Sequence, residues 1–90
     1  MRYNFVEEEK DMGNYPRHPL IERDPEVLSG KPTIKGTRLS VELILERLAD
    51  GRTPNELLES YPRLTMEGIR AALEYGAMLA TLTDDDGHAA

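Results

Sequence analysis

The tetrapeptide 53–56, Thr-Pro-Asn-Glu, constrains the fold of this chain more than any other stretch of its sequence. A threonine followed three residues later by a glutamate is a capping box, and proline suits the first helical position, so a helix is predicted to begin at Pro54. Tyr61 precedes a proline and is therefore disfavoured in helical geometry, which ends this helix near Ser60. The chain must accordingly fold around one short helix with a turn on each side.

Longer helices are predicted before and after this short one. Ser40 is a good N-cap, and Asp50-Gly51 closes the first helix because glycine accepts the left-handed conformation. Its apolar residues form one stripe: Val41, Ile44, Leu45 and Leu48. Thr65 caps the third helix, and the inner stripe expected there consists of Met66, Ile69, Leu73, Gly76 or Ala77, and Ala80.

The third helix carries a second apolar face, made of Ala71, Tyr75, Met78 and Leu82. A small domain cannot cover one helix on both sides, so two interpretations are open. Either one stripe folds into a slightly larger core, or a partner-binding surface, made of Tyr75, Met78, Leu79 and Leu82, packs on another chain.

Two short extended pieces are expected near the N-terminus, at residues 20–22 and 33–35, on either side of a turn at residues 24–26. Strands this short are unstable alone, so they pair with each other or with a second copy across a dimer. The expected organisation is an irregular lead-in over residues 1–17, a helix-turn-helix-like domain over residues 18–80 and an acidic, disordered tail over residues 81–90. The predicted fold is thus mainly α, with three helices and either a short N-terminal β-hairpin or dimer-forming strands.

The length, the cysteine content and the net charge limit the classes of protein to which the chain can belong. A chain of 90 residues buries only roughly 60–65% of its unfolded surface, so a homodimer or a partner protein is expected to add stability. The absence of cysteine excludes disulfides and thiolate sites, and no apolar run is long enough for a membrane helix. The expected location is the cytoplasm. The net charge is −6, yet residues 17–70 hold nine basic and nine acidic groups, so the acidity lies at the ends.

The segment 30–38 carries three positive charges and no negative charge, and its glycines allow backbone N–H groups to approach an anion. It is either a patch for phosphate or an acidic partner, formed by Lys31, Lys35 and Arg38, or a turn whose lysines are solvated while Arg38 pairs with Glu42. In the third helix only Arg70 is a candidate for reading DNA bases. No nucleophile, histidine pair or perturbed carboxylate pattern indicates an enzyme, a metal site, a cofactor or a small-molecule substrate.

Three motifs in fixed order resemble one known family. They are the segment 24–41 with its Gly-Lys-Pro and Gly-Thr-Arg triplets, then Leu-Ala-Asp-Gly at 48–51, then Tyr-Pro-Arg-Leu-Thr at 61–65. The chain is similar here, over roughly 60 residues, to the family catalogued as domain of unknown function 433. The residues that match its signature loop are Gly30, Lys31, Pro32, Gly36, Thr37 and Arg38, and those that match its inter-helix turn are Tyr61, Pro62, Leu64 and Thr65.

The resemblance implies a homeodomain-like, winged-helix-related core and, for many members, the role of antitoxin in a type II toxin–antitoxin pair. The partner implied is a PIN-like ribonuclease toxin, and operator DNA is a possible second ligand. Two hypotheses follow for this chain. It is either such an antitoxin, or a protein-interaction adaptor or self-associating regulator that binds no DNA. An acidic tail at Asp84 to Asp86 would suit the basic RNA groove of a ribonuclease in the first case.

Overall fold

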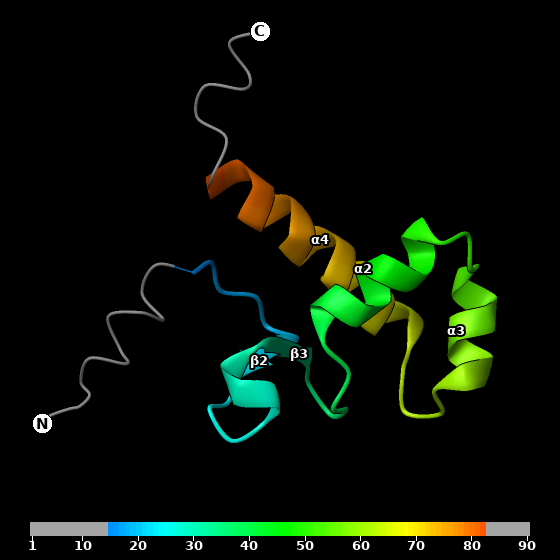
Figure 1. Ribbon diagram of the computed structural model, residues 1–90, viewed down its shortest axis with the longest axis horizontal. Coiled ribbons are helices and arrows are strands. Elements are labelled where there is room, and N and C mark those ends of the chain that lie inside the picture. The colour runs from blue at the N-terminus through cyan, green and yellow to red at the C-terminus, as the bar shows by residue number, and fades with distance from the viewer. Residues whose placement is uncertain (1–14, 83–90) are drawn as a thin grey trace, which may run out of the picture.

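The computed structural model describes residues 15–82 (Figure 1). Along the chain the elements are β2 (Ile21–Arg23), a short 3-10 helix η1 (Leu28–Gly30), β3 (Pro32–Ile34), α2 (Val41–Ala49), α3 (Pro54–Ser60) and α4 (Met66–Leu82). The hairpin contacts α2 and α4 on one side, and α3 contacts the same two helices at the other end. The predicted mainly α fold, with three helices and a short N-terminal hairpin, is confirmed.

The two strands pair with each other in antiparallel register, so the hairpin forms within one chain. Ile21 lies opposite Ile34, and both side chains are buried. The strands are displaced by one residue from the predicted ranges, toward the C-terminus in β2 and toward the N-terminus in β3. The pairing of the two isoleucines accounts for this displacement, because it buries both of them against α2 and α4.

The boundaries of α2 and α3 match the predicted caps. The Ser40 hydroxyl accepts a hydrogen bond from the Leu43 N–H at 2.9 Å, and Gly51 adopts a φ of +100° after the end of α2. In α3 the Thr53 hydroxyl accepts from the Glu56 N–H at 3.1 Å, while the Glu56 carboxylate accepts from the Thr53 N–H at 2.9 Å. This reciprocal pair is the predicted capping box, and it fixes the start of the short helix.

The buried face of α4 differs from the predicted inner stripe. Tyr75 is only 1% exposed and Ala71 is buried, whereas Leu73 is 50% exposed and Met66 is 41% exposed. The prediction that Leu73 and Met66 face inward is therefore wrong, and so is the prediction that Tyr75 packs on another chain. The α4 face that is buried carries Gly68, Ile69, Ala71, Ala72 and Tyr75.

Two glycines explain why this face is turned inward. A β-carbon at Gly68 would lie 3.1 Å from Ile34 Cγ2, and one at Gly76 would lie 3.0 Å from Leu45 Cδ1. The hairpin and α2 can approach α4 closely only where it lacks side chains. The small residues therefore mark the face of α4 that its neighbours can approach, and the larger residues Ile69 and Tyr75 are buried on the same face.

Candidate binding site

The loop between β3 and α2 is closed by its own side chain and backbone groups. Gly36 has a φ of +81°, which reverses the chain. The Thr37 hydroxyl donates to the Ile34 carbonyl at 2.7 Å and accepts from the Leu39 N–H at 3.0 Å. Thr37 therefore holds the shape of the loop, and this shape sets the position of the neighbouring Arg38.

This loop meets the turn between α3 and α4, and the two enclose a groove of about 800 Å³. We call it the loop–turn groove. Its lining residues are Glu22, Val27, Gly36, Thr37, Arg38, Leu39, Tyr61, Pro62 and Arg63. Two of the motifs that distinguish the sequence, at residues 36–38 and 61–63, thus face the same space although they are far apart in the chain.

The charges of the loop–turn groove come from Arg38, Arg63 and Glu22. Both arginines are exposed, and neither forms an ion pair with a carboxylate among residues 15–82. Arg63 is not among the site residues that the sequence predicts. Its position inside the Tyr-Pro-Arg-Leu-Thr motif was the signal, but only the fold brings it to the same groove as Arg38.

Lys31, predicted as a phosphate-binding residue, forms an ion pair on the surface of the domain. Its Nζ lies 2.9 Å from Glu42 Oε1. The hydrogen bond and the charge of Glu42 raise the pKa of Lys31, and the same hydrogen bond and the Lys31 charge lower the pKa of Glu42. The expected pairing of Glu42 with a cation of the loop is therefore found, but the cation is Lys31 and not Arg38.

The other predicted site residues are dispersed. Lys35 is exposed next to Gly36 but does not line the loop–turn groove. Gly30 has a φ of +86°, its carbonyl accepts a hydrogen bond from Arg23 Nε, and Pro32 pairs with Arg23 at the end of the hairpin. These two signature residues thus shape the hairpin.

Arg70 lies on the outward face of α4, where Met66 and Leu73 are its exposed apolar neighbours at helical spacing. Glu67 and Glu74 are exposed on the same helix and make its described surface net negative. A helix that reads the major groove usually presents several cationic or amide side chains. The outward face of α4 offers one cationic side chain, Arg70, and therefore lacks the set of side chains that usually reads DNA bases.

The C-terminal end of α4 carries its apolar face past the core. Met78 and Leu79 are half-buried against the core, and Leu82, one turn further along, is 55% exposed. Figure 1 shows this end of α4 extending away from the hairpin and from α3. We call these three residues the α4 overhang. Asp84 to Asp86, expected to contribute negative charge, lie outside the described residues.

The described residues contain neither a candidate metal centre nor a helix that could span a membrane. Between residues 15 and 82, no three His, Asp or Glu side chains are placed so that they could hold a metal ion. Over the same range, no helix combines the length and the apolar character needed to cross a bilayer.

Comparison with known proteins identifies the family of this chain and a relative of similar sequence. The model of the family described as "Protein of unknown function (DUF433)" matches residues 21–76, a range that includes the hairpin, the loop–turn groove and most of α4. The chain is 34% identical over 56 residues to the uncharacterized protein y4eO of Sinorhizobium fredii. That match covers 62% of this chain but only 25% of y4eO, so the chain spans about a quarter of the length of this relative.

A solved structure has a similar fold. It is a crystal structure of a DUF433 member protein from Anabaena variabilis, with a TM-score of 0.60 and 25% sequence identity to this chain. The similarity covers 89% of this chain and 79% of that one. The fold described above is therefore shared with that protein across most of both chains.

Proposed function

We propose a function for this chain, which belongs to the DUF433 family of proteins of unknown function. The chain is a non-catalytic binding module that serves as the antitoxin of a toxin–antitoxin pair. Its partner is a PIN-like ribonuclease, which it holds inactive in the cytoplasm. The α4 overhang is the contact surface. The observation that carries the proposal is that the apolar face of α4 continues beyond the core that buries its first half.

The overhang has the properties of an incomplete core. Tyr75 anchors the apolar face in the domain, and the same face runs on through Met78 and Leu79 to Leu82 with decreasing burial. Amphipathic helices bind partner grooves through side chains at this spacing. A partner that covers Leu82 would continue the packing that Tyr75 begins, and a second copy of the chain that covers it would make the expected homodimer.

The net negative charge on the exposed surface of α4 favours a ribonuclease as the partner of this helix over DNA. The exposed groups Glu67 and Glu74 outnumber Arg70 on this helix. A negative surface attracts the basic groove of a ribonuclease and repels a phosphate backbone. The same charges that argue against DNA reading by α4 therefore favour the proposed partner.

The test is capture of the partner by the tagged full-length protein in its own cells, followed by a ribonuclease assay of the proteins that co-elute. Leu82→Gln should reduce the recovered ribonuclease about tenfold, because loss of one anchor at the centre of an interface costs roughly 1–2 kcal/mol. Leu73→Gln is the matched control, since Leu73 is a leucine of similar exposure on the outward face. Recovery that falls with Leu73→Gln and not with Leu82→Gln contradicts the α4 overhang as the contact surface.

Binding of operator DNA is a second candidate, and the loop–turn groove is the observation that favours it. Arg38 and Arg63 come from separate motifs to one groove, and Lys35 is exposed next to Gly36 in the same loop. Phosphate contacts of this kind position a protein on DNA without reading bases. In this second candidate the DNA therefore lies on the groove, and α4 remains free for the ribonuclease.

A further inference from the structure

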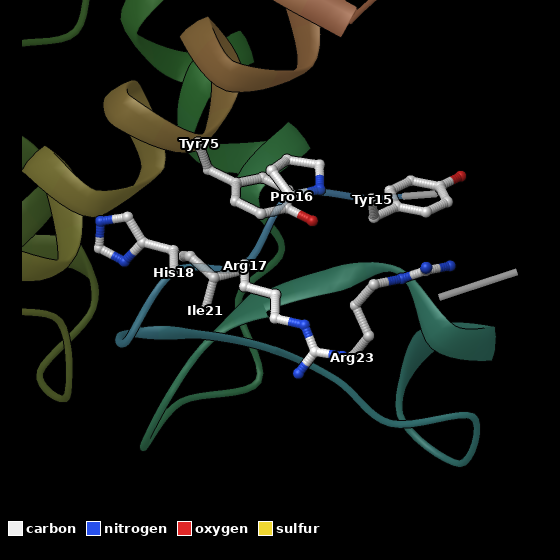
Figure 2. Close-up of a pocket in the computed structure, with 7 residues that line it drawn as sticks. All are labelled: Tyr15, Pro16, Arg17, His18, Ile21, Arg23 and Tyr75. Carbon is white, nitrogen blue, oxygen red and sulfur yellow. The ribbon is translucent and has the colours of Figure 1, made fainter. Parts of the chain in front are cut away.

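A second hollow, of about 570 Å³, lies where the chain enters the hairpin (Figure 2). Its lining residues are Tyr15, Pro16, Arg17, His18, Ile21, Arg23 and Tyr75. Among residues 15–82, two arginines and no carboxylate line it, and neither arginine is ion-paired within that range. The hollow therefore carries two positive charges that the described part of the chain leaves uncompensated.

Arg23 is held in place as a fixed donor. Its Nε donates to the Gly30 carbonyl at 2.8 Å, and its guanidinium carbon lies 3.8 Å from the centre of the Tyr15 ring. Figure 2 shows the Tyr15 ring lying over this guanidinium. Its Nη1 is buried and has no hydrogen-bond partner. A buried cationic donor without an acceptor is costly, so the described chain leaves the charge of Arg23 uncompensated beside the hollow that this residue lines.

Tyr75 adds a second unused donor, whereas His18 adds none. No described residue hydrogen-bonds to the Tyr75 hydroxyl, although the tyrosine is almost completely buried and reaches the hollow from α4. His18 accepts from the Leu20 N–H through Nδ1 and bonds Glu74 through Nε2 at 2.7 Å. His18 is therefore already occupied by Glu74 and Leu20. The donors that the described residues offer to the hollow are Arg17, Arg23 and Tyr75.

We propose that this hollow binds a small molecule that bears a phosphate monoester. A phosphate monoester carries nearly two negative charges and three acceptor oxygens, which matches two guanidinium groups and one hydroxyl, whereas a carboxylate would neutralise only one of the charges. A volume of about 570 Å³ exceeds that of a phosphate group and lies within the roughly 300–1,000 Å³ typical of small-molecule sites. The organic part of the ligand then lies against the ring of Tyr15 and the side chain of Ile21. The proposal is independent of the antitoxin function, because it uses no residue of the α4 overhang.

The test is calorimetric titration of the full-length protein with phenyl phosphate, with inorganic phosphate and benzoate as comparison ligands. We expect saturable binding of one phenyl phosphate per chain, and at least about tenfold weaker binding of benzoate. Arg17→Gln should weaken phenyl phosphate binding about tenfold, and Tyr75→Phe should weaken it by about threefold to tenfold, since each variant removes one donor to a charged group. Arg70→Gln, on the outward face of α4, is the charge-matched control and should leave binding unchanged.

Arg17 and Tyr75 are chosen because Arg17 is exposed and Tyr75→Phe keeps the ring in the core, so both variants should fold. Absence of saturable binding overturns the proposal, and so does an equal loss in Arg17→Gln and Arg70→Gln, which would indicate unspecific charge. Binding that appears only when Glu7, Glu8 and Glu9 are together replaced by Gln in the full chain would show that the chain's own acidic residues compete for the hollow, and this outcome also overturns it.

Discussion

His18 Nε2 lies 2.7 Å from Glu74 Oε1, and this contact ties the segment before the hairpin to the middle of α4. Because His18 Nδ1 accepts a hydrogen bond from the Leu20 N–H at 3.0 Å, the proton of a neutral imidazole resides on Nε2, where it is donated to the carboxylate. Glu74→Ala should therefore loosen the start of the hairpin. We expect a stability loss of about 0.5–1 kcal/mol and faster amide exchange at Leu20 and Ile21. Glu74→Gln retains an acceptor, and exchange as fast as in Glu74→Ala would contradict this role.

Gly68 should tolerate alanine less well than Gly76 does. A β-carbon at Gly68 would meet Ile34 Cγ2 at 3.1 Å and Leu64 Cδ1 at 3.3 Å, both in the buried core, so Gly68→Ala should destabilise the domain by about 1–3 kcal/mol. A β-carbon at Gly76 would meet mainly the end of the flexible Leu45 side chain, and alanine favours the helix by about 1 kcal/mol. Gly76→Ala should therefore change stability by less than about 1 kcal/mol. Urea unfolding of both variants measures the difference, and equal losses would contradict the view that Ile34 and Leu64 are held in place while the end of Leu45 can yield.

Tyr75 should make the domain sensitive to alkaline pH. Burial raises the pKa of the Tyr75 hydroxyl, although the charge of Arg23 opposes the change. The folded pKa is thus higher than the unfolded value of about 10, so the stabilising contribution is complete below about pH 10 and is lost as the pH rises through the folded pKa. Tyr75→Phe should lose less stability than the wild type as the pH rises above about 10. Parallel pH dependences of the two unfolding free energies would show that Tyr75 does not contribute.

Replacing the two arginines of the loop–turn groove should change the salt dependence of DNA binding more than replacing Lys31 does. The reason is that Lys31 is paired with Glu42, whereas Arg38 and Arg63 are not paired with a carboxylate among residues 15–82. If the groove holds phosphates, Arg38→Gln/Arg63→Gln should reduce the slope of log affinity against log salt by about 2, because about two fewer counterions are released. Lys31→Gln should reduce it by less than about 1, since Lys31 already pairs with a carboxylate at 2.9 Å. A larger effect of Lys31→Gln would place the phosphates on the other side of the loop.

The sequence predicted those parts of the fold that local interactions determine. The cap at Ser40, the capping box at Thr53 and the proline after Tyr61 act within a few residues of themselves, and the boundaries of α2 and α3 agree with them. The orientation of α4 could not be predicted in this way, because Leu73 and Tyr75 lie on two different apolar faces of this helix. Gly68 and Gly76 were the useful signal, since they mark the face against which the hairpin and α2 pack.

The candidate sites depend on contacts between distant parts of the sequence. Arg38 and Arg63 are 25 residues apart and meet only because the hairpin and α3 flank the same two helices. The sequence places Arg17 in an irregular lead-in, and no pattern in it points to Arg23 as a site residue. Their common hollow arises because the segment before β2 turns back toward α4, where His18 contacts Glu74. No periodicity in the sequence contains this information.

The most direct test of the proposed antitoxin function is the ribonuclease activity of the complex captured from the source cells, measured before and after this chain is selectively removed. A mild protease digests the antitoxin, and RNA cleavage is followed with an equal amount of complex in each sample. The account predicts little cleavage by the intact complex and a rise of at least about tenfold after removal, because the nuclease is then free of the α4 overhang. Equal cleavage before and after removal, or a captured complex that contains no ribonuclease, would contradict the antitoxin function.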